Sequence, residues 1–382
     1  MPTGLRYLIS LLKQLRVRVL FPFVGDSLGG SHKSTLLLIE FLETKNIETI
    51  VVLHQRYEPL TRLLEEKEIN FFLLPTSKLA GSDPSIPNIV FNVIRNLIPF
   101  SVFLLKHRIN IVHGNDLRIN LSWSLPSLLT FRKFVWHQRT VLSNSMFWAF
   151  IRLLSSHCIA ISRYVFESLP KNIPGTAKSM VYNPFVSIKK ESQRINEIKQ
   201  GLQIKDSDFI ISYLGRVVKE KKIDTLIRSI PLLQESPRVK ILIAGKGEEN
   251  YLKYLKELSK DLILTNRIHF LDFVENVEDY LWLSDLVVCP GPKEGFGRVV
   301  VESMMTSTPV IASRSGAHTE IIQERENGLT YKLDDQEELK DKIQELINNQ
   351  ELYQKIKINS NKTFQSFSLK KHGDSIMEIY NS

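Results

Sequence analysis

The stretch VVCPGPKEGFGRVVVE, residues 287–302, joins an apolar run to a loop with three glycines and then to the start of a helical pattern. Glu294 lies in the loop, and Glu302 lies near the end of the first helical turns. Glycines let a backbone approach a ligand closely, and a helix N-terminus presents free N–H groups to an anion. Carboxylates accept hydrogen bonds from vicinal hydroxyls. The alternative is one glutamate that caps a helix and one that faces water, but the glycine-rich context favours a site for phosphate and hydroxyl groups.

Two series of short apolar runs extend from this stretch, and helical segments separate the runs. The runs are apolar on both faces, which is typical of parallel sheets covered by helices. The sequence therefore predicts an α/β protein with two Rossmann-like, parallel-sheet domains that face a central cleft at the carboxyl ends of their strands. Strands are expected at 17–24, 47–53, 70–74, 109–113, 134–137, 158–161 and 180–182, and then at 209–214, 239–244, 268–271, 286–289, 309–312 and 329–331.

Asn183-Pro184 and the polar stretch after it separate the two series. The first domain is expected at residues 1–185 and the second at residues 186–360. Residues 361–382 are expected to form a C-terminal helix that packs back toward the first domain.

The composition is globular: 382 residues, of which 43% are apolar and 24% charged, suffice for cores without disulfide staples. Cys158 and Cys289 are the only cysteines, which favours a reducing cytosol. The longest stretch without a charged residue, 119–131, is shorter than the ~20 apolar residues of a spanning helix. No small-residue cleavage site follows the N-terminus, so neither a membrane span nor secretion is expected.

The net charge of +9 lies in the first half, because residues 1–185 carry +10 and residues 186–382 carry −1. Nine basic residues and a single acid, Asp116, lie within 84–163 among many aromatic residues. Such a half attracts a phospholipid surface, a phosphorylated acceptor or nucleic acid. Together with the basic, apolar segment Leu5–Arg18, this predicts docking on an anionic membrane. The alternative is that the aromatic side chains fill the core and the charges are solvated.

Three further loops contain glycine. Gly29-Gly30 follow the first expected strand and either approach an anion or form a tight turn capped by Ser31. Gly215-Arg216 with Lys221 suits a diphosphate, although a solvated basic loop has the same composition. Gly245-Lys246-Gly247 is only a fragment of a dinucleotide fingerprint.

The order of these motifs resembles the retaining glycosyltransferases of family four, also called glycosyl transferases group 1, which have the GT-B fold. The resemblance covers most of residues 17–331, and the second-domain motifs are the specific ones. They are Glu294-Gly-Phe-Gly with Glu302, Thr308-Pro-Val-Ile-Ala-Ser313, Gly316 with Glu320, Asn327-Gly-Leu329, Gly215-Arg216 with Lys221, and Ala244-Gly-Lys-Gly-Glu248. One departure is Lys222, where the family usually has glycine.

The resemblance implies a role for each matching residue. Arg216 and Lys221 would bind the nucleotide diphosphate and stabilise charge on it, while Glu302 would bind the ribose hydroxyls. Glu294 would hold the donor sugar, Phe296 and Gly297 would supply backbone contacts, and Gly29-Gly30 would close over the phosphates. His113 falls where the family often has a histidine near the reacting sugar. These positions are Gly29, Gly30, His113, Arg216, Lys221, Glu294, Phe296, Gly297 and Glu302.

Other polar residues carry weaker expectations. His113 has an alternative role as a buried histidine bonded to a backbone carbonyl. His137 and Arg139 end another first-domain strand and either contact a phosphorylated acceptor or only line a loop. Asp206-Ser-Asp208 has the D-x-D pattern of a metal site but is expected to form a turn, so no metal and no cofactor are predicted.

The sequence thus predicts a cytoplasmic glycosyltransferase at the inner face of the plasma membrane. It would move a hexosyl or N-acetylhexosaminyl group, with retention, from a nucleotide diphosphate sugar to a lipid-linked glycan in bacterial surface polysaccharide synthesis. A UDP-sugar is favoured over a GDP-sugar. An epimerase that acts on a sugar nucleotide without an acceptor is the alternative. A nucleic-acid partner is not expected, because modules with readable signatures are absent.

Overall fold

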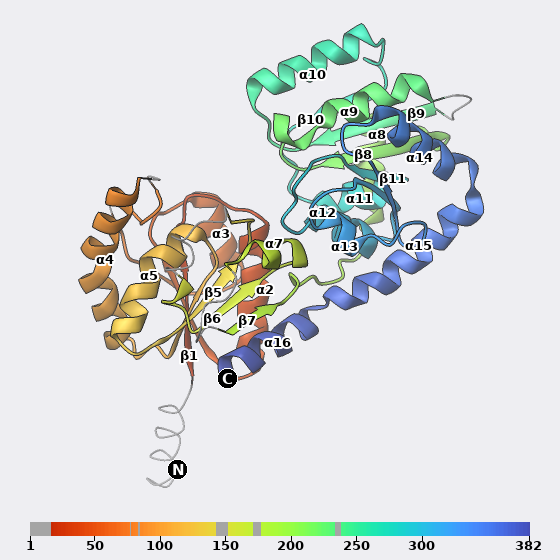
Figure 1. Cartoon of the computed structure of the whole chain (residues 1–382). Coiled ribbons are helices and arrows are strands. Elements are labelled where there is room, and N and C mark those ends of the chain that lie inside the picture. The colour runs from red at the N-terminus through yellow and green to blue at the C-terminus, as the bar shows by residue number, and fades with distance from the viewer. Residues whose placement is uncertain (1–16, 77, 83–84, 143–151, 171–176, 234–237) are drawn as a thin grey trace. The chain divides into compact units, whose positions relative to one another are not determined.

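The computed structural model describes residues 17–76, 78–82, 85–142, 152–170, 177–233 and 238–382 (Figure 1). Two compact units divide the chain, and we describe each by itself. The first unit consists of residues 1–184 together with 369–382, and the second consists of residues 185–368. The expected membrane segment Leu5–Arg18 up to residue 16, and the aromatic residues Phe147, Trp148 and Phe150, lie outside the described residues.

The first unit contains a seven-stranded sheet in which every pair of neighbouring strands is parallel. Apolar side chains on both faces of its central strand β1, such as Val19, Leu20 and Phe21, are completely buried. Burial on both faces therefore confirms the parallel arrangement that the apolar runs predict. The strand order is β3 (Phe71–Leu73), β2 (Glu48–Leu53), β1 (Arg18–Phe23), β4 (Ile111–Gly114), β5 (Lys133–Gln138), β6 (His157–Ala160) and β7 (Ala177–Met180).

Helices connect these strands because parallel neighbours need crossover connections. They are α2 (Gly30–Thr44), α3 (Glu58–Glu66), α4 (Ile86–Lys106), α5 (Leu117–Leu129) and α7 (Arg163–Ser168). The last helix of the chain, α16 (Leu369–Asn381), also belongs to this unit. Its Ile376 and Ile379 join the core, and Gly373 allows close packing because an added Cβ would lie 2.3 Å from the Phe41 ring.

The second unit contains a six-stranded sheet that is also entirely parallel. Its strand order is β10 (Ile268–Leu271), β9 (Arg238–Ala244), β8 (Asp208–Leu214), β11 (Leu286–Cys289), β12 (Val310–Ser313) and β13 (Leu329–Tyr331). The described helices of eight or more residues are α8 (Ser192–Gly201), α10 (Glu249–Asp261), α12 (Arg298–Met305), α14 (Gln336–Asn348) and α15 (Gln350–Phe364). Shorter ones are α9 (Ile223–Ser229), α11 (Val277–Leu283), α13 (His318–Ile321), η1 (Lys219–Lys221), η2 (Ile230–Leu232) and η3 (Gln365–Phe367).

Each sheet has one topological switch point, where the connections turn from one direction along the sheet to the other. In the first unit it lies between β1 and β4, and in the second between β8 and β11. Open parallel sheets bind ligands outside the carboxyl ends of the strands at such points. The loops after these four strands are therefore where a site is expected.

Two boundaries differ from the sequence expectation by three residues or more. The last first-unit strand covers 177–180 instead of 180–182, because this edge strand is mostly exposed and carries no apolar run. The chain returns to the first unit at Leu369 instead of residue 361, since α15 stays with the second unit up to Phe364.

Helix α4 is long and apolar enough to cross a bilayer by length and composition alone, which makes it the one such helix among the described residues. The search for the longest stretch without a charged residue does not find α4, because Arg95 lies within the helix. Seven of its large apolar side chains are exposed, and we call them the outer face of α4: Ile86, Val90, Phe91, Ile94, Ile98, Val102 and Leu105.

Candidate functional site

The loops after β8 and β11 bring together the charged residues expected at the second-unit site. Arg216 follows β8 and is exposed, and Lys221 ends the short helix η1 after it. The loop after β11 carries Glu294, and α12 after that loop carries Glu302. All of them lie at the switch point between β8 and β11. The structure thus places two cations and two carboxylates where such sheets bind ligands.

Lys221 and Glu294 form an ion pair through Nζ and Oε1. Their side chains are 23% and 26% exposed, so a polar ligand can still reach both partners. Gly291 keeps this region open, because an added Cβ would lie 3.1 Å from Lys221 Cδ and 3.5 Å from Glu294 Oε1. A ligand with a phosphate beside a hydroxyl can replace the contact between the two residues, because the phosphate then pairs with Lys221 and the hydroxyl donates to Glu294.

Glu302 is bonded to a residue that the sequence analysis does not single out. Arg298 donates from Nε and Nη2 to Glu302 Oε1 at 3.2 and 3.1 Å, one turn apart on α12. The guanidinium carbon of Arg298 also lies 4.4 Å from the centroid of the Phe185 ring. Because a carboxylate has about four lone-pair positions, Glu302 keeps the capacity to accept further bonds.

Two glycines shape the loop that carries Glu294. Gly316 has φ +60°, and an added Cβ would lie 2.7 Å from the backbone N and O of Glu294. Gly297, with φ +83°, precedes α12, and an added Cβ would lie 2.9 Å from the His318 ring. Left-handed φ values favour glycine at both positions. Phe296 is 3% exposed, so its side chain packs inward and anchors the loop.

His318 is a further residue that sequence reasoning misses. Its imidazole is 1% exposed, and Nδ1 is 3.1 Å from the Ser313 carbonyl oxygen. Burial lowers the pKa of His318, so the ring is neutral at pH 7 and supports the loop without adding charge. A histidine two residues after the Gly316 motif is the signal that could have identified it.

The departure at Lys222 has a conformational explanation. Lys222 has φ +54° and ψ +39°, in the left-handed region, and links η1 to α9. Glycine adopts this region without strain, which accounts for its expected presence here. The Lys222 ammonium group lies 3.1 Å from Asp334, which compensates part of the cost. The loop therefore takes the course that a glycine would give it.

The Gly245-Lys246-Gly247 fragment supports the neighbouring loop. Gly245 has φ +143°, and an added Cβ would lie 2.0 Å from the carbonyl oxygen of Gly215. The N–H of Val217 donates to the carbonyl of Lys246 at 2.9 Å. This contact fixes the backbone on both sides of Arg216.

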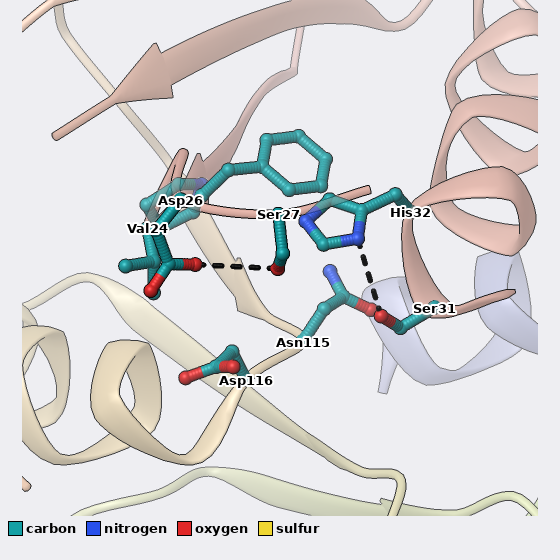
Figure 2. A pocket seen from close by; sticks show the side chains of 9 residues that line it. Val24, Asp26, Ser27, Ser31, His32, Asn115 and Asp116 are labelled. Carbon is teal, nitrogen blue, oxygen red and sulfur yellow. Dashed lines mark hydrogen bonds between the residues drawn. The ribbon is translucent and has the colours of Figure 1, made fainter. Parts of the chain in front are cut away.

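The first unit has a small pocket at its own switch point, between β1 and β4 (Figure 2). Gly29 is the N-cap residue of α2, and its N–H donates to His32 Nδ1 at 3.2 Å, so His32 rather than Ser31 accepts this bond at the helix start. An added Cβ on Gly29 would meet nothing within 4 Å, which leaves the Gly29-Gly30 turn open. The pocket is lined by Pro22, Phe23, Val24, Asp26, Ser27, Ser31, His32, Asn115 and Asp116.

Two carboxylates at this pocket share one cation. Arg118 Nη1 donates to Asp26 at 2.6 Å, and Arg118 Nε donates to Asp116 at 3.2 Å. Burial opposes ionisation of Asp26, but hydrogen bonds and the charge of Arg118 outweigh it and lower the pKa of the carboxyl group. Burial also lowers the pKa of His32. The pocket therefore presents the ionised Asp26 carboxylate and a neutral imidazole, which are acceptors for hydroxyl groups.

The structure buries His113 completely. Its Nδ1 is 2.6 Å from the Tyr380 hydroxyl, and its Nε2 is 3.0 Å from His137 Nδ1. His137 is also fully buried and stacks on His372, whose Nδ1 is 2.6 Å from the Tyr182 carbonyl oxygen. Both ring nitrogens of His113 are thus engaged, so contact with a sugar requires movement of its neighbours.

Arg139 lies beside the pocket and not inside this histidine cluster. It donates to Asn183 at 2.6 Å, to Asn115 at 2.7 Å and to Thr35 at 3.3 Å. Because Asn115 lines the pocket, Arg139 positions one pocket wall.

The D-x-D residues lie at the start of β8, whereas the site lies beyond the other end of the same strand. Asp208 begins β8 and accepts from the N–H of Lys205 at 2.8 Å, whereas Asp206 is exposed and lies 3.2 Å from Lys199. In the part of the chain that the structure describes, no group of three or more His, Cys, Asp or Glu residues is arranged to hold a metal.

Two Rossmann-like units with polar loops at both switch points define the class of protein as GT-B. Solved structures share this fold over nearly the whole chain. The HepE protein of Anabaena, in complex with UDP and glucose, aligns with a TM-score of 0.80 and 21% identity over 96% of this chain and 100% of that chain. A glycosyltransferase from Rickettsia africae aligns with a TM-score of 0.84 and 19% identity over 96% and 98% of the two chains.

Sequence comparison finds a family model that matches part of the chain. Residues 194–363 match the model described as Glycosyl transferases group 1. This match spans most of the second unit.

Curated relatives align over part of their length. The uncharacterized glycosyltransferase MJ1607 of Methanocaldococcus jannaschii is 33% identical over 139 residues, 36% of this chain and 35% of the relative. The lipopolysaccharide core biosynthesis mannosyltransferase LpsB of Rhizobium meliloti is 28% identical over 49% of this chain and 55% of the relative. The capsular polysaccharide biosynthesis glycosyltransferase CapM of Staphylococcus aureus is 28% identical over 46% and 47%. The alignments thus span about a third to a half of these relatives.

Proposed function

We propose that the chain is a glycosyltransferase that moves a sugar from a nucleotide diphosphate sugar to an acceptor hydroxyl. The observation that carries this proposal is the group Arg216, Lys221, Glu294 and Glu302 at the β8–β11 switch point. Two cations suit a diphosphate, and two carboxylates suit the hydroxyls of a sugar and a ribose. The family match of the second unit supports the same activity.

The Lys221–Glu294 ion pair suggests how the donor is accommodated. A diphosphate attracts the Lys221 ammonium group, which leaves the Glu294 carboxylate to accept hydrogen bonds from the sugar. Arg216 and Lys221 then stabilise the negative charge that develops on the departing nucleoside diphosphate. Catalysis rests on this charge stabilisation and on positioning. We propose retention of the anomeric configuration, by a front-face route, on the resemblance alone.

The finer specificity is also a proposal. We favour a UDP-sugar because HepE, which shares the fold, is described in complex with UDP and glucose. We favour a hexosyl or N-acetylhexosaminyl group and a lipid-linked glycan acceptor in surface polysaccharide synthesis, because relatives bear capsular and lipopolysaccharide names. We assign the acceptor to the first unit, which carries the excess positive charge, and the place of work to the inner face of the plasma membrane.

A panel of UDP- and GDP-sugars tests the proposal in two stages. Thermal shift identifies the donor that stabilises the chain, and release of nucleoside diphosphate is then measured with and without glycolipid acceptors. Lys221→Ala should lower turnover strongly, whereas Lys219→Ala, an exposed lysine in the same turn, should leave it near the wild-type rate. Release that needs an acceptor supports transfer, while conversion of the sugar nucleotide alone indicates the epimerase alternative. No binding by any member of the panel would overturn the proposal.

A further inference from the structure

Helix α4 carries large apolar side chains on both sides, including the side that faces away from the unit. Ile94 and Ile98 of the outer face are 62% and 74% exposed. The opposite side buries apolar residues and two asparagines, and Asn96 Nδ2 donates to the Lys78 carbonyl at 3.0 Å. The buried residues are Ile89, Asn92, Asn96, Phe100, Phe103 and Leu104. Helices on the surface of a globular protein normally turn their apolar stripe inward. An outward stripe of this length indicates a second apolar environment.

The exposed apolar surface continues onto the next helix. Helix α5 packs beside α4 on the first unit (Figure 1), and the Phe100 ring of α4 stacks on Trp123 of α5 at 4.1 Å. At the end of α5, Leu128 and Leu129 are 49% and 55% exposed, and Phe131 after it is 95% exposed. Most other described aromatic side chains of this region fill the core. Most of the exposed apolar side chains of α4 and α5 are therefore aliphatic, and Phe91 and Phe131 are the exposed aromatic ones among them.

The formal charges along helix α4 and the residues that follow it to 115 have one sign. Residues 85–115 contain no Asp or Glu, while Arg95 and Lys106 are exposed on α4 itself and Arg108 is exposed just after it. A second copy of the chain on this face would bring like charges together, with no acid on either helix α4 to pair with them. An anionic bilayer provides apolar chains for the stripe and negative headgroups for its basic border.

The packing of helix α4 within the first unit does not allow it to cross a bilayer. It connects β3 to β4 of one sheet and is packed on α5, so it cannot leave the unit without exposing Phe100 and Trp123, which are completely buried. Its 21 residues form a strip about 30 Å long.

We propose that the outer face of α4 is a docking surface for an anionic lipid bilayer. Its aliphatic side chains enter the interface, and Arg95 and Lys106 contact the headgroups. This surface goes beyond the proposed sugar transfer and does not depend on it, so either proposal can fail alone.

The test is co-sedimentation of the full chain with vesicles of phosphatidylcholine, with and without one third phosphatidylglycerol. The double variant Ile94→Gln/Ile98→Gln removes two exposed apolar side chains and keeps charge and helix propensity. Ile358→Gln, a 58% exposed isoleucine on α15, is the matched control. Arg95→Gln/Lys106→Gln tests the basic border.

We expect the wild type and Ile358→Gln to bind the anionic vesicles. The double isoleucine variant should bind about tenfold more weakly or less, and the charge variant should lose its preference for phosphatidylglycerol. Circular dichroism melts establish that each variant is folded. Equal sedimentation of the wild type and the double isoleucine variant would overturn the proposal. So would light scattering that shows a lipid-free dimer which the same substitutions convert to a monomer, because a second copy then occupies the face.

Discussion

Replacing Glu302 with alanine is the sharpest test of the donor site. The Glu302 side chain is 18% exposed and accepts two bonds from Arg298, four residues earlier on α12. A helical ion pair of this kind contributes only ~0.5 kcal/mol to stability, so the variant should remain folded. The loss of an acceptor for ribose hydroxyls costs ~1 to 3 kcal/mol of binding free energy. That range corresponds to a dissociation constant roughly 5- to 150-fold higher.

Titration calorimetry with the donor identified in the panel measures this change. Glu345→Ala is the matched control. Glu345 lies on α14 of the same unit, and its carboxylate is paired with Arg325 as the carboxylate of Glu302 is paired with Arg298. The affinity of Glu345→Ala for the donor should equal that of the wild type. Arg298→Gln removes the partner of the Glu302 carboxylate but keeps the carboxylate itself. This variant should therefore weaken donor binding less than Glu302→Ala does. Unchanged affinity in a folded Glu302→Ala protein would refute the assignment of this carboxylate to the ribose.

Three other predictions concern charge, backbone and pH. Turnover should persist in excess EDTA, because Arg216 and Lys221 supply the positive charge at the diphosphate; complete loss restored by manganese would contradict this. Lys222→Gly should keep or raise the unfolding free energy in urea, since relief of the left-handed backbone offsets an exposed ion pair worth less than ~1 kcal/mol; a larger loss would contradict the strain argument. Burial lowers the pKa of His54 to about 4 and that of His372 to about 3. As the pH falls below 6.5, the unfolded chain binds protons at these histidines while the folded chain does not, so the free energy of unfolding decreases. Each contributes about 1.4 kcal/mol of loss at pH 5.5, and His372→Gln should therefore show a smaller loss between pH 7.5 and 5.5 than the wild type; an equal loss would contradict the assignment.

Most of the fold follows from the apolar runs. The strands expected at 268–271, 286–289 and 329–331 have the same bounds in the structure. The second of these is a central strand and the other two are edge strands, but all three carry apolar residues that mark them in the sequence. The strand at Ala177–Met180 is displaced from its expectation because an exposed edge strand carries no such signal.

The site divides along similar lines. Spacing along the chain identifies Glu294 and Glu302, since loop and helix position follow from local sequence. Partners remain hidden when they depend on side-chain direction, as with the Arg298 contact to Glu302. The burial of His113 likewise depends on Tyr380, which is distant in sequence and comes from α16. Sequence patterns therefore locate loops better than they locate contacts between distant segments.

Release of nucleoside diphosphate from the panel of nucleotide sugars tests the central claim most directly. The account predicts that one donor is consumed in the presence of a glycolipid acceptor, and that Lys221→Ala and Glu302→Ala reduce this release while Lys219→Ala and Glu345→Ala do not. Early anomeric proton spectra of the product should show the configuration of the donor. Donor consumption that is equal in all four variants, or absent with every nucleotide sugar, would contradict the claim that the β8–β11 switch point is the site of sugar transfer.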